Sequence, residues 1–134
     1  RSIRRVFDIL FNSFDKPNSF YHRLLHRTKA WDYRLPGWDP PPPPPFGKGD
    51  PLGKRPTRCV TYKRAVRRTA LTALLSLPEQ CVCTETYKLF VYSARCFLVD
   101  VRVQISDMPL ADCFEIHTRY KFVSVGDEGE GIET

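Results

Sequence analysis

The chain has 134 residues, of which 42% are hydrophobic and 13% aromatic. This length and composition suffice for one domain with a hydrophobic core, and they exclude an intrinsically disordered chain. No apolar run approaches the roughly 18–20 consecutive residues that cross a bilayer. The net charge of +6 is uneven, because residues 1–70 hold 16 Lys and Arg against 5 Asp and Glu, whereas residues 71–134 hold 5 against 10. A basic first half suits a polyanion, either anionic lipid headgroups or nucleic acid, and ordinary scatter of surface charge is the alternative.

The first thirty residues predict two short amphipathic helices. Hydrophobic residues recur at helical spacing from Ile3 to Phe14, with Ser2 as a candidate cap and Pro17 as the end. A second helix is predicted over Phe20–Arg27. Its candidate caps are Asn18 and Ser19, and the residues expected to face the core are Phe20, Leu24 and Leu25.

The middle of the chain combines an irregular segment with further strands. Residues 31–38 predict a short strand that runs into a loop over residues 39–56, where six successive prolines donate no amide hydrogens and impose polyproline geometry. The prolines at 40–45 predict either a ligand for a polyproline-binding partner or a stiff spacer, and we favour the spacer. Strands are predicted over 57–70 and 80–92, and residues 69–77 fit a helix or a strand.

Two runs in the last third of the chain alternate apolar and polar residues at period two, which is typical of half-buried strands. One face of the first run carries Phe97, Val99, Val101, Val103 and Ile105. One face of the second carries Phe114, Ile116, Thr118, Tyr120 and Phe122. Residues 106–112 link them, and Pro109 cannot continue a ladder, so the pair predicts an antiparallel hairpin. The apolar face of such a sheet needs a cover, and we expect part of that cover to be a ligand.

No catalytic constellation is evident in the sequence. A nucleophile needs a base that a carboxylate orients, and Glu115 and His117 form only a weak candidate pair that is expected to face solvent. The glycines lie among prolines rather than between a strand and a helix, so no phosphate-binding loop is predicted. We therefore predict a domain that is not an enzyme and has no cofactor.

The cysteines and histidines do not predict a metal site. The five cysteines are an odd number, which favours a reduced cytosolic setting over a disulfide framework. Cys81 and Cys83 lack a second pair at zinc-ligand spacing. His22 and His26 lie one helical turn apart with no acidic or sulfur ligand placed to complete a site, so we expect them on a helix surface.

Four motifs in order resemble one family. They are VFDILF in the first helix, PGW before the loop, RCVTY opening a strand, and FLVDVRVQISDMPLADCFEIHTRYKF. Together they resemble the VASt domain of the Aster and Lam sterol transporters, relatives of the StAR-related lipid-transfer fold, over about residues 3–125. The most specific part is the final hairpin, which carries Asp107, Pro109, Asp112, Phe114, Arg119 and Tyr120.

The resemblance implies an α+β helix-grip, START-like fold, in which a curved antiparallel sheet with two short N-terminal helices grips a long C-terminal helix around a cavity for one sterol. It also implies work on the cytoplasmic face of the endoplasmic reticulum membrane, at membrane contact sites, through an anchor outside this chain. We expect a lipid-binding domain at 1–125 and an acidic, glycine-rich tail at 126–134. The family's first strand would precede Ser2, and its closing strands and long helix would follow Val125. The cavity would then lack a wall, and we expect the chain to be poorly stable or self-associating.

Ten residues are candidate ligand contacts: Trp38, Val60, Tyr62, Phe97, Val99, Val101, Phe114, Ile116, Thr118 and Tyr120. Of these, Tyr62, Thr118 and Tyr120 are candidate polar partners for the lipid hydroxyl. For any single apolar residue, filling the core is the default role. The candidate membrane-facing basic residues are Arg4, Arg5, Arg23, Arg27, Arg67 and Arg68.

The favoured hypothesis is a carrier that extracts a sterol from one bilayer and releases it at another. A module that only docks on anionic membranes ranks second. A nucleic-acid-binding sheet ranks third, because Tyr120 falls in register with Phe114 and Ile116 and is expected to point inward rather than onto an open basic face.

Overall fold

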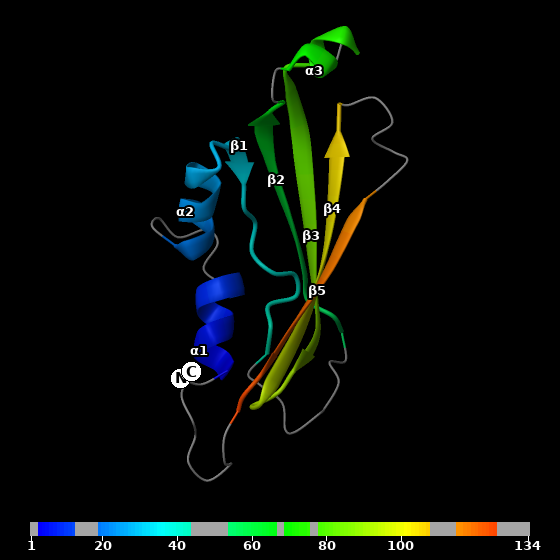
Figure 1. The fold of residues 1–134 in the computed structure, drawn as a ribbon. Helices are drawn as coiled ribbons and strands as arrows, with labels where there is room; N and C mark the ends of the chain where they lie inside the picture. Colours follow the sequence, from blue (N-terminus) through cyan, green and yellow to red (C-terminus); the bar gives the residue numbers. More distant parts are fainter. Residues whose placement is uncertain are drawn as a thin grey trace.

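The computed structural model describes residues 3–12, 19–43, 54–66, 69–75, 78–107 and 115–125. Its helical elements are α1 (Ile3–Phe7), the π-helical turn η1 (Asp8–Asn12), α2 (Phe20–Arg27) and α3 (Ala70–Leu74). Its strands are β1 (Trp31–Arg34), β2 (Thr57–Ala65), β3 (Gln80–Tyr92), β4 (Cys96–Ser106) and β5 (Ile116–Val123). Figure 1 shows their arrangement.

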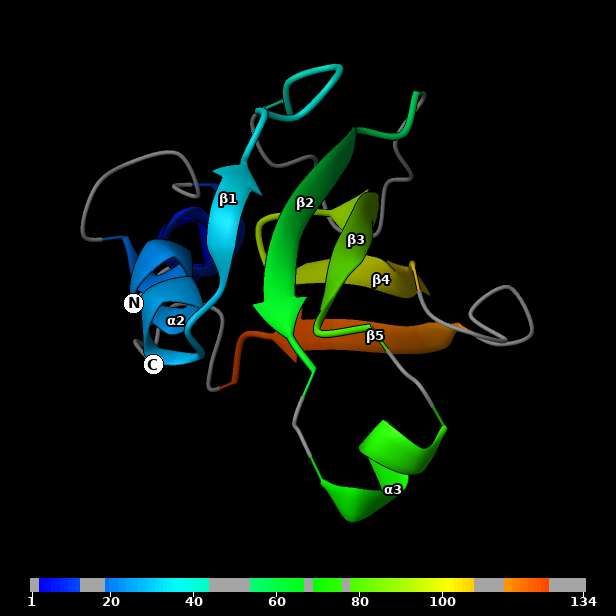
Figure 2. The same ribbon diagram turned by 90° about the horizontal axis from the view of Figure 1, so that it is seen from above.

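The strands form one antiparallel sheet in chain order, β1-β2-β3-β4-β5, so each strand pairs with the next along the chain. The sheet is curved, and α1 and α2 lie on one side of it (Figure 2). We call the face toward these helices the inner face, and the opposite one the outer face. The predicted START-like architecture of a curved antiparallel sheet with two short N-terminal helices is confirmed.

Strand register confirms the predicted alternation. On the inner face Val99 lies opposite Leu89 on β3 and Tyr120 on β5, and Val101 lies opposite Tyr87 and Thr118. The strand predicted over 80–92 is confirmed as β3. The strand predicted over 57–70 ends earlier, at Ala65, and the ambiguous segment that follows contains the helix α3.

The first predicted helix is present, but it is not a regular α-helix. It begins as α1 and continues as the wider turn η1. The helical spacing nevertheless identified the covered side, because Ile3, Phe7 and Phe11 are buried. Phe14 and the candidate cap Ser2 lie outside the described residues.

The second predicted helix is confirmed, and Ser19 is its cap, since its Oγ accepts a hydrogen bond from the His22 amide at 3.1 Å. The buried side chains of α2 are Tyr21 and Leu25. The prediction that Phe20 and Leu24 face the core was wrong, because they are 46% and 43% exposed. The side of α2 that faces the sheet is therefore rotated relative to the predicted one. It carries Tyr21, whose ring is apolar and whose hydroxyl is polar, in place of Phe20.

The two ends of the proline-rich loop meet beside β2. Asp39 and Thr57 exchange two backbone hydrogen bonds of 2.8 and 3.1 Å. Apart from this bridge, residues 39–43 and 54–56 form no strand or helix, as predicted, while residues 44–53 lie outside the described part of the chain. Trp38 and Pro56 flank the bridge and are buried, so the described ends of this segment are anchored in the core.

Candidate functional site

The inner face is packed with aromatic rings at one end, which we call the filled end. It consists of Phe7, Phe11, Trp38, Tyr92, Phe97 and Phe122. The ring of Phe7 lies 4.7 Å from that of Tyr92 and 5.3 Å from that of Phe97, and Phe97 stacks on Phe122 at 4.7 Å. These rings come from α1, β3, β4 and β5, so they fill the space between the helix and the sheet.

The backbone carbonyl of Phe11 links several segments at the filled end through hydrogen bonds. The Phe11 oxygen, in the last turn of η1, accepts hydrogen bonds at 3.0 Å from Trp38 Nε1 and from Arg58 Nη1. Carbonyls at a helix end have no intrahelical partner and need outside donors. The Arg58 guanidinium also lies 5.8 Å from the Trp38 ring. Trp38 therefore acts here as a core residue with a satisfied indole N–H.

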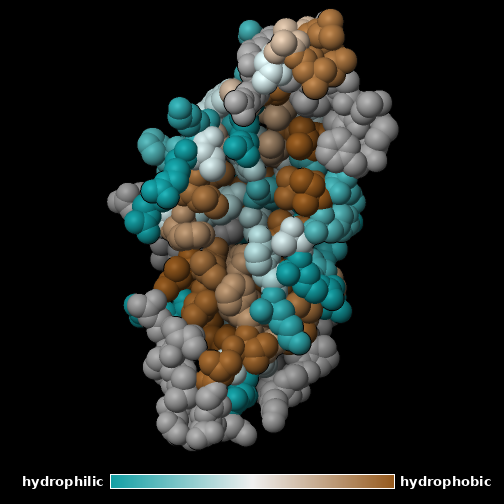
Figure 3. All heavy atoms as spheres, viewed as in Figure 1, coloured by the Kyte–Doolittle hydropathy of each residue, from teal (hydrophilic) through white to brown (hydrophobic). Residues whose placement is uncertain are grey.

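The other end of the inner face is more exposed, and we call it the open end. It consists of Val103, Ile105, Ile116 and Thr118, and of Tyr120 at the border with the filled end, where its ring lies 5.9 Å from that of Phe11. Val103 and Ile105 on β4 are half-buried, whereas Ile116 and Tyr120 on β5 are 52% and 41% exposed. On the side of the molecule that carries β5, hydrophobic residues gather over α1 and along the sheet (Figure 3). Exposed apolar residues that adjoin one another are a common feature of binding surfaces.

A carboxylate lies on the inner face in register with the open end. Glu85 is half-buried on β3, directly opposite Val60 on β2 and Val103 on β4. Its Oε1 accepts hydrogen bonds from the hydroxyls of Tyr87, at 2.6 Å, and Tyr21, and its Oε2 accepts one from Tyr62 at 2.6 Å. We call these four residues the tyrosine-carboxylate cluster.

The electrostatics of the tyrosine-carboxylate cluster determine which groups donate the hydrogen bonds. Burial first, and then the neighbouring Glu85 charge and hydrogen bonds, raise the pKa of Tyr21, Tyr62 and Tyr87 well above the usual value for tyrosine. The three phenols therefore stay protonated and donate, and Glu85 accepts. A carboxylate offers about four acceptor sites. Because the described phenols occupy three of them, Oε2 retains capacity for one further donor.

The structure separates the predicted ligand contacts into groups. Trp38, Phe97 and Val99 are packed at the filled end or next to it. Val60, Tyr62 and Val101 are buried on the inner face around the tyrosine-carboxylate cluster. Ile116, Thr118 and Tyr120 lie at the open end, on the inner face as predicted but exposed to solvent. Phe114 lies outside the described residues. Contact with a ligand stays a prediction for all ten.

The sequence interpretation missed Glu85, Tyr21 and Tyr87. A signal was available, because Cys83, Glu85, Tyr87 and Leu89 alternate along one strand, so the carboxylate had to share a face with apolar neighbours. A charged residue in register with a buried set indicates either a functional group or a satisfied network. Both faces of the 80–92 strand are partly apolar, which concealed this register.

The basic residues lie on the helices that cover the inner face. Arg4 and Arg5 on α1 and Arg23 and Arg27 on α2 are exposed. Arg67 and Arg68 lie outside the described residues. His26 is exposed, while His22 is half-buried with its ring 5.5 Å from that of Tyr33.

The described residues contain no group of three or more His, Cys, Asp or Glu that could hold a metal ion. The described cysteines, Cys59, Cys81, Cys83 and Cys96, are thiols without disulfides. In the same part of the chain, no helix has the length and apolar character needed to cross a bilayer.

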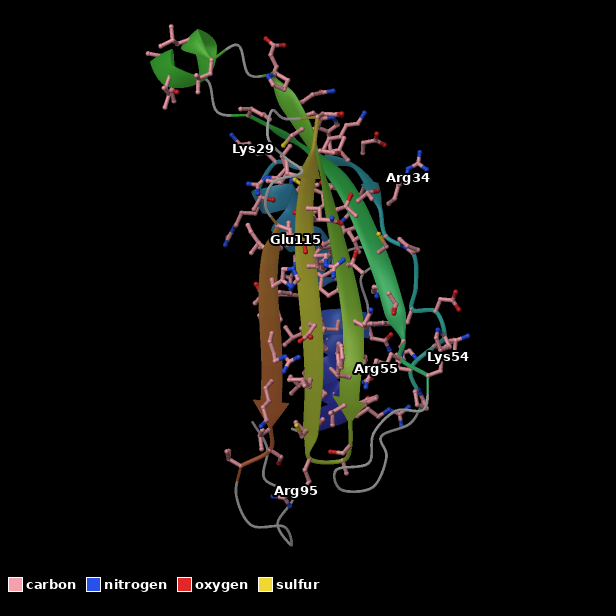
Figure 4. The ribbon with its side chains drawn as sticks, turned by 90° about the vertical axis from the view of Figure 1, so that its right-hand side faces the viewer. Lys29, Arg34, Lys54, Arg55, Arg95 and Glu115 are labelled. Carbon is pink, nitrogen blue, oxygen red and sulfur yellow. The ribbon has the colours of Figure 1, made fainter. Side chains whose placement is uncertain are left out.

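The outer face is polar and is held by ion pairs. Arg119 donates two hydrogen bonds to Asp100, at 2.7 and 2.9 Å, and lowers the pKa of that carboxyl. Glu115 lies 2.6 Å from His117 Nε2 and 3.5 Å from Arg102 Nε (Figure 4). These residues line or adjoin a hollow of about 330 Å³ on β3, β4 and β5. Its charged walls do not suit an apolar ligand.

A comparison with family models decides the identity. The model of the VAD1 Analog of StAR-related lipid transfer domain, VASt, matches residues 2–131. The chain belongs to the VASt family. No curated protein matches it.

VASt membership agrees with the fold described above and implies lipid binding in general, a function that needs no catalytic residues. The inner face of this VASt domain is thus the candidate lipid-binding surface, since it is the apolar side of the sheet. The division into a domain at 1–125 and a tail at 126–134 stays a prediction, because the tail lies outside the described residues.

Proposed function

We propose that this VASt domain binds one sterol-like lipid at the open end of the inner face and carries it between membranes without changing it chemically. The observation that carries the proposal is the tyrosine-carboxylate cluster at the level of the open end, where Glu85 on β3, Val103 on β4 and the exposed Ile116 on β5 are in register. A sterol is almost wholly apolar and has one hydroxyl. Its rings fit a surface such as that of Ile116 and Tyr120, and its hydroxyl can donate to the remaining acceptor site of Glu85.

The proposed setting is the cytoplasmic face of the endoplasmic reticulum membrane, where it meets another membrane. Exposed arginines on α1 and α2 support attraction to anionic lipids, since each basic residue near such a surface contributes at most about 1 kcal/mol. Docking without lipid transfer is the second candidate function, supported by the same arginines. Liposome binding that weakens as salt rises would support the electrostatic contribution, and binding insensitive to salt would contradict it.

Titration with a fluorescent sterol tests the carrier proposal. We expect saturable binding at about one sterol per chain. Ile116→Ser is expected to weaken binding about tenfold, since it removes an apolar contact. His117→Ser is the matched control, because it changes the next residue of the same strand on the outer face. Absence of saturable binding by the folded chain would refute the proposal.

A second titration isolates the hydroxyl. We expect the O-methyl ether of the same sterol to bind more weakly, because it has no proton to donate to Glu85. Glu85→Gln is expected to reduce the difference in affinity between the sterol and its ether, since a neutral amide oxygen is a weaker acceptor than a carboxylate. Equal affinity for the sterol and its ether would remove Glu85 from the proposed site while leaving the apolar contacts in place.

A further inference from the structure

The short helix α3 stands at the tip of the hairpin formed by β2 and β3, apart from the sheet and from the other helices (Figures 1 and 2). The base of this connection is closed by a 2.9 Å hydrogen bond from the Val66 amide to the Glu79 carbonyl. Helical hydrogen bonds of 3.0 Å join the Ala73 amide to Thr69 and the Leu75 amide to Leu71. The tip is therefore an ordered helical turn at the end of two long strands.

The surface of α3 is apolar and exposed. Leu71, Leu74 and Leu75, at positions i, i+3 and i+4, share one side of the helix and are 63%, 79% and 58% exposed. Ala70 and Ala73 are exposed as well. Such a stripe is normally buried against the rest of a protein. Here the hydrophobic surface extends to the extremity of the molecule, as the space-filling view shows (Figure 3).

The chain that leads into α3 is basic. Between residues 63 and 68 the sequence holds Lys63, Arg64, Arg67 and Arg68 and no acidic residue, although Lys63 forms an ion pair of 3.2 Å with Asp32 on β1. Arg64 is exposed at the end of β2, whereas α3 itself carries no charge. Apolar side chains preceded by Lys and Arg are complementary to the boundary between acyl chains and anionic headgroups.

We propose that α3 is a membrane-docking tip, whose leucines enter the headgroup boundary of an anionic bilayer while Arg64, at the end of β2, lies among the headgroups. The inference rests on the proposed exchange of lipid with membranes, and it names the element that makes the contact. A groove on a protein partner or on a second copy would cover one side of α3. A bilayer surrounds an inserted tip, which agrees with the exposure of the alanines as well as the leucines.

Vesicle flotation tests the tip, with phosphatidylcholine vesicles that contain or lack phosphatidylserine. The variant L71S/L74S/L75S is expected to lower partitioning onto the anionic vesicles at least about tenfold. A matched control, I9S/L24S/V125S, removes three exposed apolar side chains elsewhere and is expected to change partitioning less than twofold. Because all six side chains are exposed, both variants are expected to fold, which circular dichroism checks. Wild-type partitioning of the α3 variant would overturn the proposal.

A second measurement reports insertion directly. L74W places an indole at the tip, and lipids brominated in the acyl chains are expected to quench its emission beyond the quenching seen in the parent chain. Quenching no greater than that of the parent would also overturn the proposal. Dissociation of an oligomer by L71S/L74S/L75S, with vesicle binding unchanged, would instead identify α3 as a contact between copies.

The two proposals fail in different ways. Docking that depends on α3 in a chain that binds no sterol would refute the carrier function and leave the tip in place. Sterol binding with docking that does not depend on α3 would refute only the tip. Sterol binding in the absence of vesicles is expected to be the same in the parent chain and in L71S/L74S/L75S.

Discussion

The filled end and the open end of the inner face are built from the same strands and the same alternation of residues, yet their burial differs. At the filled end Phe97 is fully buried under Phe7 and beside Phe122. At the open end Ile116 lies in register with Val103 and is 52% exposed. The difference arises from what covers the sheet, since α1 and η1 supply rings over one end. Periodicity decides the face of a strand, and the packing partner decides whether that face becomes core or surface.

The largest expected effect comes from breaking the filled end. Phe97→Ala removes a fully buried ring that contacts three other aromatic rings, so we expect a loss of about 3–5 kcal/mol in the free energy of unfolding. Ile116→Ala, on the same face at the open end, is expected to cost less than about 1 kcal/mol. Urea unfolding measures both. Equal losses would show that the two ends are packed alike.

A smaller effect of alkaline pH on stability is expected at the tyrosine-carboxylate cluster. The unfolded chain releases a tyrosine proton near its usual pKa of 10.0, whereas folded Tyr62 and Tyr87 retain theirs because burial and Glu85 raise their pKa values. Stability is therefore complete below about pH 10 and falls as pH rises through the window up to the folded pKa, by about 1.4 kcal/mol per pH unit for each tyrosine.

Other groups contribute within the same range, since burial raises the pKa of Tyr92 to about 12 and that of the Cys83 thiol to about 11. The double variant Y62F/Y87F isolates the cluster. It is expected to be less stable at pH 8 but to lose stability less steeply between pH 9.5 and 11.5 in urea titrations. An unchanged slope would mean that the two phenols are not protected by folding.

The smallest expected effect concerns the outer face, where ion pairs are exposed. Arg119 lowers the pKa of Asp100, so the stability that this pair contributes is present above the unfolded pKa of about 3.8 and is lost as pH falls through the folded value. Asp100→Asn is expected to reduce the unfolding midpoint only slightly at pH 7, and to make it less sensitive to acid. A midpoint shift as large as that of Phe97→Ala would contradict this ranking.

Sequence reasoning predicted most of the sheet because its long strands follow a regular alternation. Strands β4 and β5 lie where period two places them, β3 lies where a strand with two partly apolar faces was predicted, and Ser19 caps α2 for a local reason that a sequence reveals. The segment at 69–77 stayed ambiguous, since a short run of small apolar residues fits a helix and a strand equally. The helix α3 in this segment lies apart from the sheet, and no local sequence pattern encodes that position.

The candidate site was predicted in part for the same physical reason. Alternation placed Val101, Ile116 and Tyr120 on one face, but it could not separate a packed end from an exposed one, because that depends on where α1 lies. The rotation of α2 that buries Tyr21 instead of Phe20 was equally hidden. Tyr21 reaches Glu85 across 64 residues of sequence, and such a pairing is set by the fold rather than by spacing.

The carbonyl of Phe11 has a consequence for spectroscopy. It joins η1 to Trp38 and to β2 at once, across 27 and 47 residues, so the three segments can separate only by losing both hydrogen bonds. The Trp38 indole proton is therefore expected to exchange with deuterium only when η1 leaves the sheet. The indole proton of Trp31, which is 39% exposed on β1, is expected to exchange quickly. With only two tryptophans in the chain, slow and fast indole signals in one NMR spectrum would distinguish opening of the core from fraying of the edge.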